Sequence, residues 1–196
     1  MTIGRGIHPD GGFHPDGDWA RAVLAFWFGS LAPKDWFAVS EDVDRGITER
    51  FSDLYAWAAS RSPALLAQDA PTVRAAIIVL DQFPRNMFRG SARAFATDAL
   101  ALELARTAVA RDFDRGLTVD EAVFVYIPFE HSEDLADQER AVRLISGLGD
   151  KTYTDYALRH RDVIKRFGRF PHRNAVLGRT TTPVEAEFLA VHPGGF

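Results

Sequence analysis

The chain has 196 residues, 46% of them hydrophobic and 26% charged, with a formal net charge of -4 and no cysteine. These values are typical of one globular domain with a sizeable apolar core, and they exclude disulfides, thiolate metal sites and a cysteine nucleophile. No apolar run approaches the roughly 18 residues that a membrane-spanning helix needs. We therefore expect a cytoplasmic protein that is not associated with a membrane.

The first 17 residues repeat the tetrapeptide HPDG, at positions 8–11 and 14–17. Proline, aspartate and glycine favour turns, and chain termini rich in small and polar residues are often poorly ordered. We expect residues 1–17 to form a flexible arm and residues 18–196 to form a single all-α domain.

Helical periodicity begins directly after this arm. Asp18 is placed to cap a helix that ends at Gly29. The second helix is indicated by an apolar stripe at steps of three and four residues: Val43, Ile47, Phe51, Leu54 and Ala58. A third helix is expected over 73–80 with Pro84 as its limit, because proline removes a backbone donor. The alanine- and leucine-rich segment 100–109 predicts a fourth.

The second half of the chain continues the helical pattern. Thr118 and Glu121 have the spacing of a capping box that opens a helix over 119–127, which we expect Pro128 to end or kink. No segment alternates as a strand would, so the sequence predicts an all-α fold of about eight helices joined as antiparallel hairpins. The remaining helices are expected over 135–145, over 153–167 up to Gly168, and after Thr182.

Two blocks of opposite charge lie in this half. Residues 120–139 contain seven acidic residues and no lysine or arginine, whereas residues 159–179 contain seven basic residues and one acidic residue, Asp162. Nucleic-acid binding needs a surplus of basic surface. Because the two blocks match in size, we expect them to neutralise each other, and we do not expect a nucleic-acid partner.

The string PFEHSE at 128–133 places several polar residues directly after a proline. His131 begins the face of the next predicted helix, and His160 lies among apolar residues of its own helix, so both rings are expected to point inward. An inward histidine is often only a hydrogen-bonded core residue, but two of them beside carboxylates can form an acid–base pair. The candidate catalytic residues are Glu130, His131 and Glu133.

A second polar string, FPHRN at 170–174, echoes FPRN at 83–86. Two interpretations remain open: the arginines bind an anionic ligand, or they clamp neighbouring helices by pairing with carboxylates and carbonyl groups. Under the first interpretation the candidate ligand-binding residues are Arg85, Asn86, His160, Arg169, His172, Arg173 and Asn174.

Several familiar site motifs are missing from the sequence. There is no HExxH, HxH or EF-hand spacing, no G-x-S-x-G elbow and no glycine-rich phosphate loop. The sequence therefore predicts no metal site, and it identifies neither a cofactor nor a reaction.

Four strings carry a family resemblance: VLAFWFG, IIVLDQFPRNMFRGSARAFATDALAL, YIPFEHSEDLADQER and HRDVIKRFGRFPHRNAVLGRTTTPVEAEFL. In this order, from about Val23 to Leu189, the chain resembles the bacterial family called domain of unknown function 924. The resemblance implies an all-α fold similar to that of tetratricopeptide-repeat proteins, and it brings no established reaction, substrate or cofactor. The 34-residue period of true tetratricopeptide repeats is absent.

The leading functional hypothesis is a pocket for a small polar or anionic molecule, built from the PFEHSE and FPHRN strings. The alternative is a non-enzymatic helical scaffold or protein-interaction module in which both strings are structural clamps. A symmetric homodimer is the expected assembly only because such dimers are common.

Overall fold

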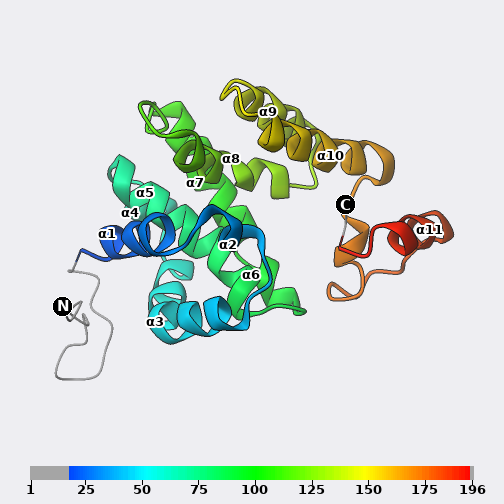
Figure 1. Cartoon of the computed structure of the whole chain (residues 1–196), viewed down its shortest axis with the longest axis horizontal. Helices are drawn as coiled ribbons and strands as arrows, with labels where there is room; N and C mark the ends of the chain where they lie inside the picture. The colour runs from blue at the N-terminus through cyan, green and yellow to red at the C-terminus, as the bar shows by residue number, and fades with distance from the viewer. Residues whose placement is uncertain (1–17, 195–196) are drawn as a thin grey trace.

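The computed structural model describes residues 18–194, and the predicted N-terminal arm lies outside this range. Every regular element within it is helical and none is a β-strand, as Figure 1 shows. Eight continuous helical stretches in this range have seven or more residues. The predicted all-α class and the number of helices are confirmed.

Side-chain caps determine where the helices of the first half begin. Ser40 accepts a hydrogen bond from the backbone N–H of Val43, and Asp69 accepts one from Thr72 at 2.8 Å. The elements are α1 (Trp19–Leu24), η1 (Ala25–Ser30), α2 (Pro33–Phe37), α3 (Glu41–Ala59), α4 (Pro63–Leu66), α5 (Ala70–Ile77), η2 (Ile78–Gln82), α6 (Phe83–Met87), η3 (Ala92–Phe95) and α7 (Asp98–Ala110).

The second half begins with the predicted capping box, in which Thr118 and Glu121 exchange hydrogen bonds at the start of α8. Asp150 caps α10 by accepting a hydrogen bond from the backbone N–H of Tyr153 at 3.0 Å. The elements are α8 (Val119–His131), α9 (Leu135–Ser146), α10 (Lys151–Phe167), η4 (Pro171–Arg173) and α11 (Pro183–Val191).

Pro84 does not stop its helix, contrary to expectation, and Pro128 does not end α8, which was one of the two outcomes expected there. The path from 70 to 87 is continuous, because Pro84 lies in the first turn of α6, where its missing N–H costs little. Pro128 lies inside α8, which continues to His131. Residues 122–130 of α8 are all buried, so the packing of this helix outweighs one lost hydrogen bond.

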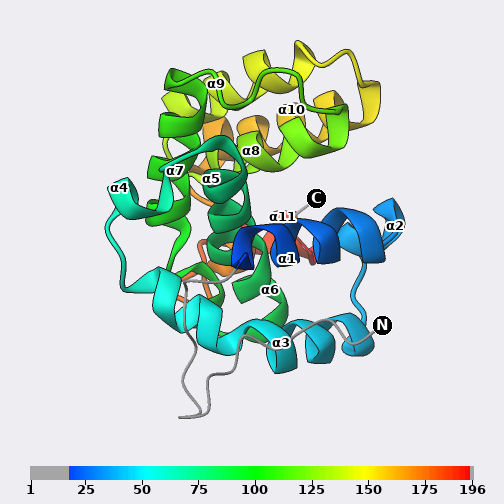
Figure 2. The same cartoon turned by 90° about the vertical axis from the view of Figure 1, so that its left-hand side faces the viewer.

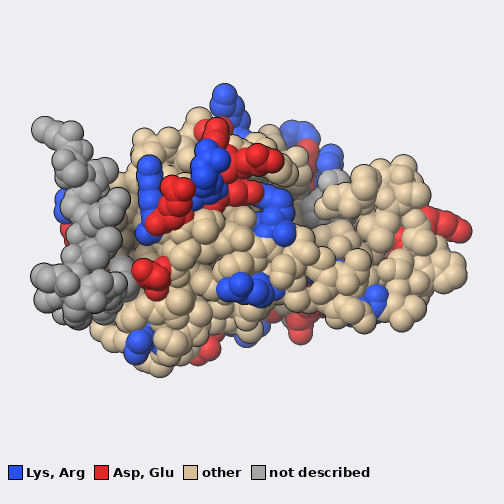
Figure 3. All heavy atoms as spheres, turned by 90° about the horizontal axis from the view of Figure 1, so that it is seen from below, with Lys and Arg blue, Asp and Glu red and all other residues tan. Residues whose placement is uncertain are grey.

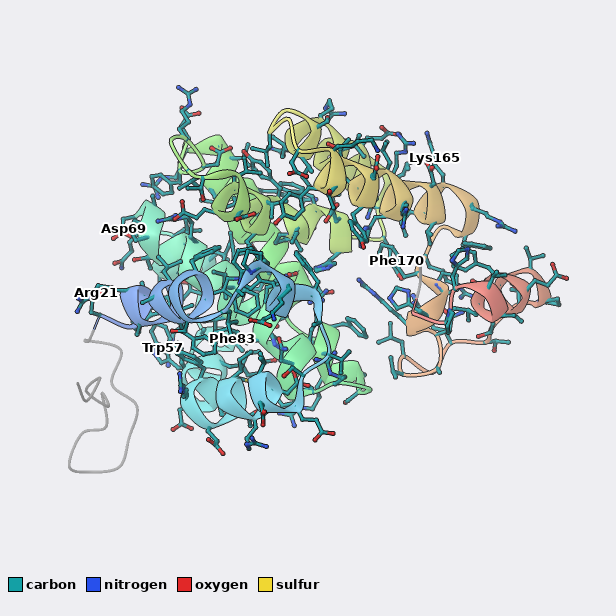
Figure 4. The ribbon with its side chains drawn as sticks, in the orientation of Figure 1. Arg21, Trp57, Asp69, Phe83, Lys165 and Phe170 are labelled. Atoms are coloured by element: carbon teal, nitrogen blue, oxygen red, sulfur yellow. The ribbon has the colours of Figure 1, made fainter. Side chains whose placement is uncertain are left out.

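Phe83 lies at the centre of the main core. It is completely buried, and its ring contacts Trp27 at a centroid distance of 5.8 Å and Phe51 at 4.8 Å. Figure 4 shows it between α1 and α3. The phenylalanine of the first Phe-Pro step is thus held by dense aromatic packing.

The helices pack around this core. In Figure 2, α9 and α10 lie at the top, α3 at the bottom, and α5, α6 and α8 between them. Helix α8 packs on α9, and α9 packs on α10. Helix α11 lies at the end of the molecule remote from α1 (Figure 1) and reaches α10 through Phe188, whose ring is 5.1 Å from that of Phe167.

The two charge blocks are partly joined by ion pairs. Arg179 pairs with Glu133 at 2.7 Å and Lys165 with Glu139 at 3.3 Å. On the face shown in Figure 3, acidic and basic side chains are intermixed. None of the helices in residues 18–194 combines the length and apolar character needed to cross a membrane.

Replacing Gly168 with alanine is expected to lower the free energy of unfolding by about 1 kcal/mol. Gly168 ends α10 with φ of 68°, in the left-handed region, where a Cβ is strained although no neighbouring atom would touch it. The matched control is Gly46→Ala in α3, where the added Cβ also has open space and is expected to stabilise the helix by about 0.5–1 kcal/mol. Urea unfolding measures both changes; a loss at Gly46 or a gain at Gly168 would contradict this account.

Candidate functional site

The π-helical turn η2 places Asp81 at the centre of a buried polar network. Asp81 is fully buried, and its Oδ1 lies 2.8 Å from Nδ1 of His131. Gln82 donates to its other carboxylate oxygen, and Arg85 donates to its backbone carbonyl. Burial alone would raise the pKa of Asp81, but Arg85 and His131 lower it to about 2. Asp81 is therefore a buried anion at neutral pH.

Asp98 connects the two arginines of this network. Both terminal nitrogens of the Arg85 guanidinium donate to the Asp98 carboxylate oxygens, at 2.9 and 3.0 Å. Arg173 reaches the same carboxylate with one nitrogen only, at 3.5 Å, and donates to the backbone carbonyl of His131 at 3.1 Å. Arg85 is thus paired bidentately, whereas Arg173 shares a carboxylate that is already occupied.

The guanidinium of Arg173 is stacked between two aromatic rings. Its central carbon lies 4.6 Å from the ring centroid of Phe95 and 4.5 Å from that of Phe170. The residue is only 6% exposed, and its Nε is buried without a hydrogen-bond partner in residues 18–194. Burial, with the repulsion of Arg85, lowers the pKa of Arg173 to about 10. Arg173 remains cationic at neutral pH with incomplete pairing.

A cavity of about 370 Å³ opens beside Arg173. Phe170, at the junction between α10 and the C-terminal segment in Figure 4, forms part of its wall. Its lining residues are Arg85, Arg89, Gly90, Ala94, Phe95, His131, His160, Phe170, His172, Arg173 and Gly194. The lining is therefore cationic, imidazole-bearing and aromatic, and no carboxylate side chain of residues 18–194 contributes to it.

The three histidines of the cavity are neutral at pH 7. Burial, followed by the charge of Arg85, lowers the pKa of His131. Burial, with the neighbouring ring of His131, lowers the pKa of His160 to about 3, and burial with Arg173 lowers that of His172 to about 4. The rings of His131 and His160 lie 6.2 Å apart between centroids. Nδ1 of His160 lies 2.9 Å from the backbone carbonyl of Tyr156. Because a carbonyl only accepts hydrogen bonds, Nδ1 carries the proton in this ring.

Glu130 is buried next to His131 in the chain but does not line the cavity. Its Oε1 has no hydrogen-bond partner in the described range 18–194. Burial, reinforced by the negative charge of Asp81, raises the pKa of Glu130 to about 8. Glu130 is therefore mostly a neutral carboxylic acid at pH 7.

The other candidate residues lie in ion pairs outside the cavity lining. Glu133 receives two hydrogen bonds from Arg179 and one from the backbone N–H of Phe170. Two guanidinium nitrogens of Arg169 donate to the Glu185 carboxylate at 2.6 and 2.8 Å. The side-chain amide of Asn174 donates to the same carboxylate at 3.3 Å. These contacts tie the segment after α10 to the loop between α8 and α9 and to α11, as a clamp would.

Asn86 also lies outside the cavity lining, in a contact with α3. Its side chain donates to Asp44 at 2.8 Å, and Arg89 grips the same carboxylate. The structure thus brings Arg85, His131, His160, His172 and Arg173 together on one cavity, and distributes Asn86, Glu133, Arg169 and Asn174 among interhelical contacts.

Sequence reasoning missed four residues that shape the cavity or its network: Asp81, Phe95, Asp98 and Phe170. Asp81 carried a signal, because it lies four residues before Arg85, the spacing of a helical ion pair. Asp98 carried none, since its partners Arg85 and Arg173 lie 13 and 75 residues away. No group of three or more histidine, aspartate or glutamate side chains suited to hold a metal ion occurs within residues 18–194.

Comparison with known proteins places this architecture in a family. The sequence pattern of a family described as bacterial protein of unknown function (DUF924) matches residues 23–193. The chain is similar to a protein of unknown function from Agrobacterium tumefaciens whose structure is solved, with 42% sequence identity and a TM-score of 0.82 over 87% of this chain and 96% of that chain. A search of curated proteins finds no match. The chain therefore belongs to the bacterial DUF924 family of proteins of unknown function.

Proposed function

We propose that this protein binds a small anionic molecule in the cavity beside Arg173. The observation that carries the proposal is the incomplete pairing of Arg173, a buried cation whose Nε has no partner in residues 18–194 and whose nearest carboxylate is already held by Arg85. Burying a charge without full compensation is costly, and an anionic ligand supplies the missing compensation.

The surroundings of Arg173 support the same class of ligand. Arg85 and Arg89 also line the cavity, and its three histidines are neutral, so no acidic side chain there repels an anion. The rings of Phe95 and Phe170 hold the guanidinium plane in one orientation, which suits a planar carboxylate or a phosphate oxygen pair.

The test is isothermal titration calorimetry with inorganic phosphate, sulfate, malonate and pyruvate as probes. Arg173→Met keeps an unbranched side chain between the two rings but removes the charge, and we expect it to weaken binding of the responding anion by at least about ten-fold. Arg21→Met, in a side chain that is 80% exposed on α1, makes the same change in net charge remote from the cavity and should bind as the wild type does.

Circular dichroism shows whether Arg173→Met retains its helices. If it does not fold, Arg173→Lys, which keeps the charge and loses the fork, takes its place and should also bind more weakly. Wild-type affinity in either folded variant would refute the assignment of Arg173.

A scaffold or interaction module is the second candidate function, and the clamp contacts of Glu133, Arg169 and Arg179 favour it. The two candidates differ in their response to anions. A pure scaffold would show no saturable heat with any probe, and its stability would not rise on addition of phosphate or a carboxylate.

A further inference from the structure

A π-helical turn and the C-terminal end of α8 bring an anion and an imidazole together next to the cavity. Asp81 lies on the π-helical turn η2, a kind of distortion that is frequent at functional sites. His131 is the last residue of α8, three positions after Pro128. Their contact at 2.8 Å joins segments 50 residues apart in the chain.

This contact determines which nitrogen of His131 is basic. Asp81 is ionised and therefore only accepts hydrogen bonds, so Nδ1 of His131 carries the proton and donates it to Oδ1. In the neutral ring the lone pair is then on Nε2. The ring lines the cavity, and the carbonyl of His131 is held by Arg173. A base of fixed tautomer and the incompletely paired cation are thus linked by one direct hydrogen bond.

We propose that His131, positioned by Asp81, is a general base that removes a proton from carbon in a small 2-oxo acid bound beside Arg173. The proposal rests on the anion-binding function above and names its substrate class. The carboxylate of the oxo acid meets the cationic lining, and the acidic hydrogen is the one on the carbon next to the keto group.

The step is a proton transfer that balances without any other reagent. Nε2 of His131 takes the proton, the C–H electron pair becomes the C=C bond of an enolate, and the carbonyl π pair moves to the oxygen. The cations of the cavity offset the charge that develops on that oxygen. Return of a proton from His131 to carbon regenerates the oxo acid, and in heavy water the returning particle is a deuteron.

The composition of the lining favours proton transfer at carbon over acyl transfer. Among residues 18–194, no serine, threonine or tyrosine hydroxyl lines the cavity, so this part of the chain offers the base no nucleophile to activate. A base next to a cation in a partly apolar pocket is instead the arrangement that enolate formation requires.

The experiment measures hydrogen exchange at carbon by proton NMR in heavy water, with pyruvate, 2-oxobutyrate and 2-oxoglutarate. Binding of each acid is measured first by calorimetry. We expect the wild type to exchange the hydrogens next to the keto group faster than buffer does, and His131→Gln to be at least about 100-fold slower while binding the acid within a few-fold of wild type. His192→Gln, in an exposed histidine after α11, is the matched control and should exchange at the wild-type rate.

The role of Asp81 has its own readout. Nitrogen-15 spectra of the histidine rings are expected to show His131 with its proton on Nδ1 in the wild type and on Nε2 in Asp81→Asn, because the amide can present a donor to Nδ1. A wild-type ring protonated on Nε2 would overturn the proposal even if His131→Gln fails to fold.

The outcomes separate this proposal from the anion-binding function. An oxo acid that binds without exchange above the buffer rate, or exchange that survives in His131→Gln, overturns the general base and leaves anion binding intact. Binding of phosphate but of no oxo acid does the same. Absence of binding by every probe overturns both.

Discussion

Asp98→Ala is expected to lower the free energy of unfolding by about 3–5 kcal/mol, which is the cost of removing one partner from a buried ion-pair network. Asp98 is the bidentate partner of Arg85 and the one carboxylate that Arg173 reaches within residues 18–194. Its removal leaves two guanidinium groups that are 20% and 8% exposed with less compensation than burial demands. Denaturation in urea, followed by circular dichroism, measures the loss.

The control for Asp98→Ala is Asp42→Ala, which breaks the pair with Arg45 in side chains that are 85% and 60% exposed. Such surface pairs contribute about 0–1 kcal/mol, so little change is expected there. The double variant Asp98→Ala/Arg85→Met should recover part of the stability, because it removes one of the stranded charges together with its partner. A loss below 1 kcal/mol for Asp98→Ala would show that the network contributes little to folding.

The stability of the wild type is expected to be greatest near pH 7 and to fall on both sides. On the acidic side, His131, His160 and His172 have pKa values below their unfolded value near 6.5, so the unfolded chain binds more protons and stability falls as the pH drops. On the alkaline side, Glu130 acts alone in the opposite sense. Its folded pKa of about 8 exceeds the unfolded value of 4.5, so its stabilising effect is lost as the pH rises to 8.

Glu130→Gln is expected to abolish the alkaline decline and to leave the acidic one. One proton corresponds to a change of about 1.4 kcal/mol for each pH unit, so the stability of the wild type relative to Glu130→Gln should fall by about this much between pH 6.5 and 7.5. Unfolding in urea across pH 5–8 gives both profiles, and Glu187→Gln on the outer face of α11 is the control. A stability difference between the wild type and Glu130→Gln that stays constant between pH 6.5 and 8 would show that Glu130 is already ionised in the native state.

The helical framework of this protein could be read from its sequence because helix formation is largely local. The cap of Asp69 and the Thr118–Glu121 capping box act within four residues, and Gly168 ends α10 through its own backbone conformation. The expected stop at Pro84 was wrong because this proline falls in the first turn of α6, where its missing N–H costs little.

The candidate site was only partly predictable, for the opposite reason. The sequence marked PFEHSE and FPHRN as chemically distinct but left open whether they bind a ligand or clamp helices. In the structure adjacent residues take different surroundings: His172 and Arg173 line the cavity, whereas Asn174 joins Arg169 on Glu185. A difference of one position in a tight turn rotates a side chain to another face, and no composition rule resolves it.

The sequence by itself thus determined the all-α class, the ends of most helices and the two strings that carry the polar chemistry. Only the tertiary structure decided which carboxylate each arginine takes, because Asp98 and Asp81 reach Arg173 and His131 across 75 and 50 residues. Those pairings depend on how helices pack around a shared core, and packing is a property of the whole chain. The incompletely paired Arg173 and the fixed tautomer of His131 are consequences of that packing.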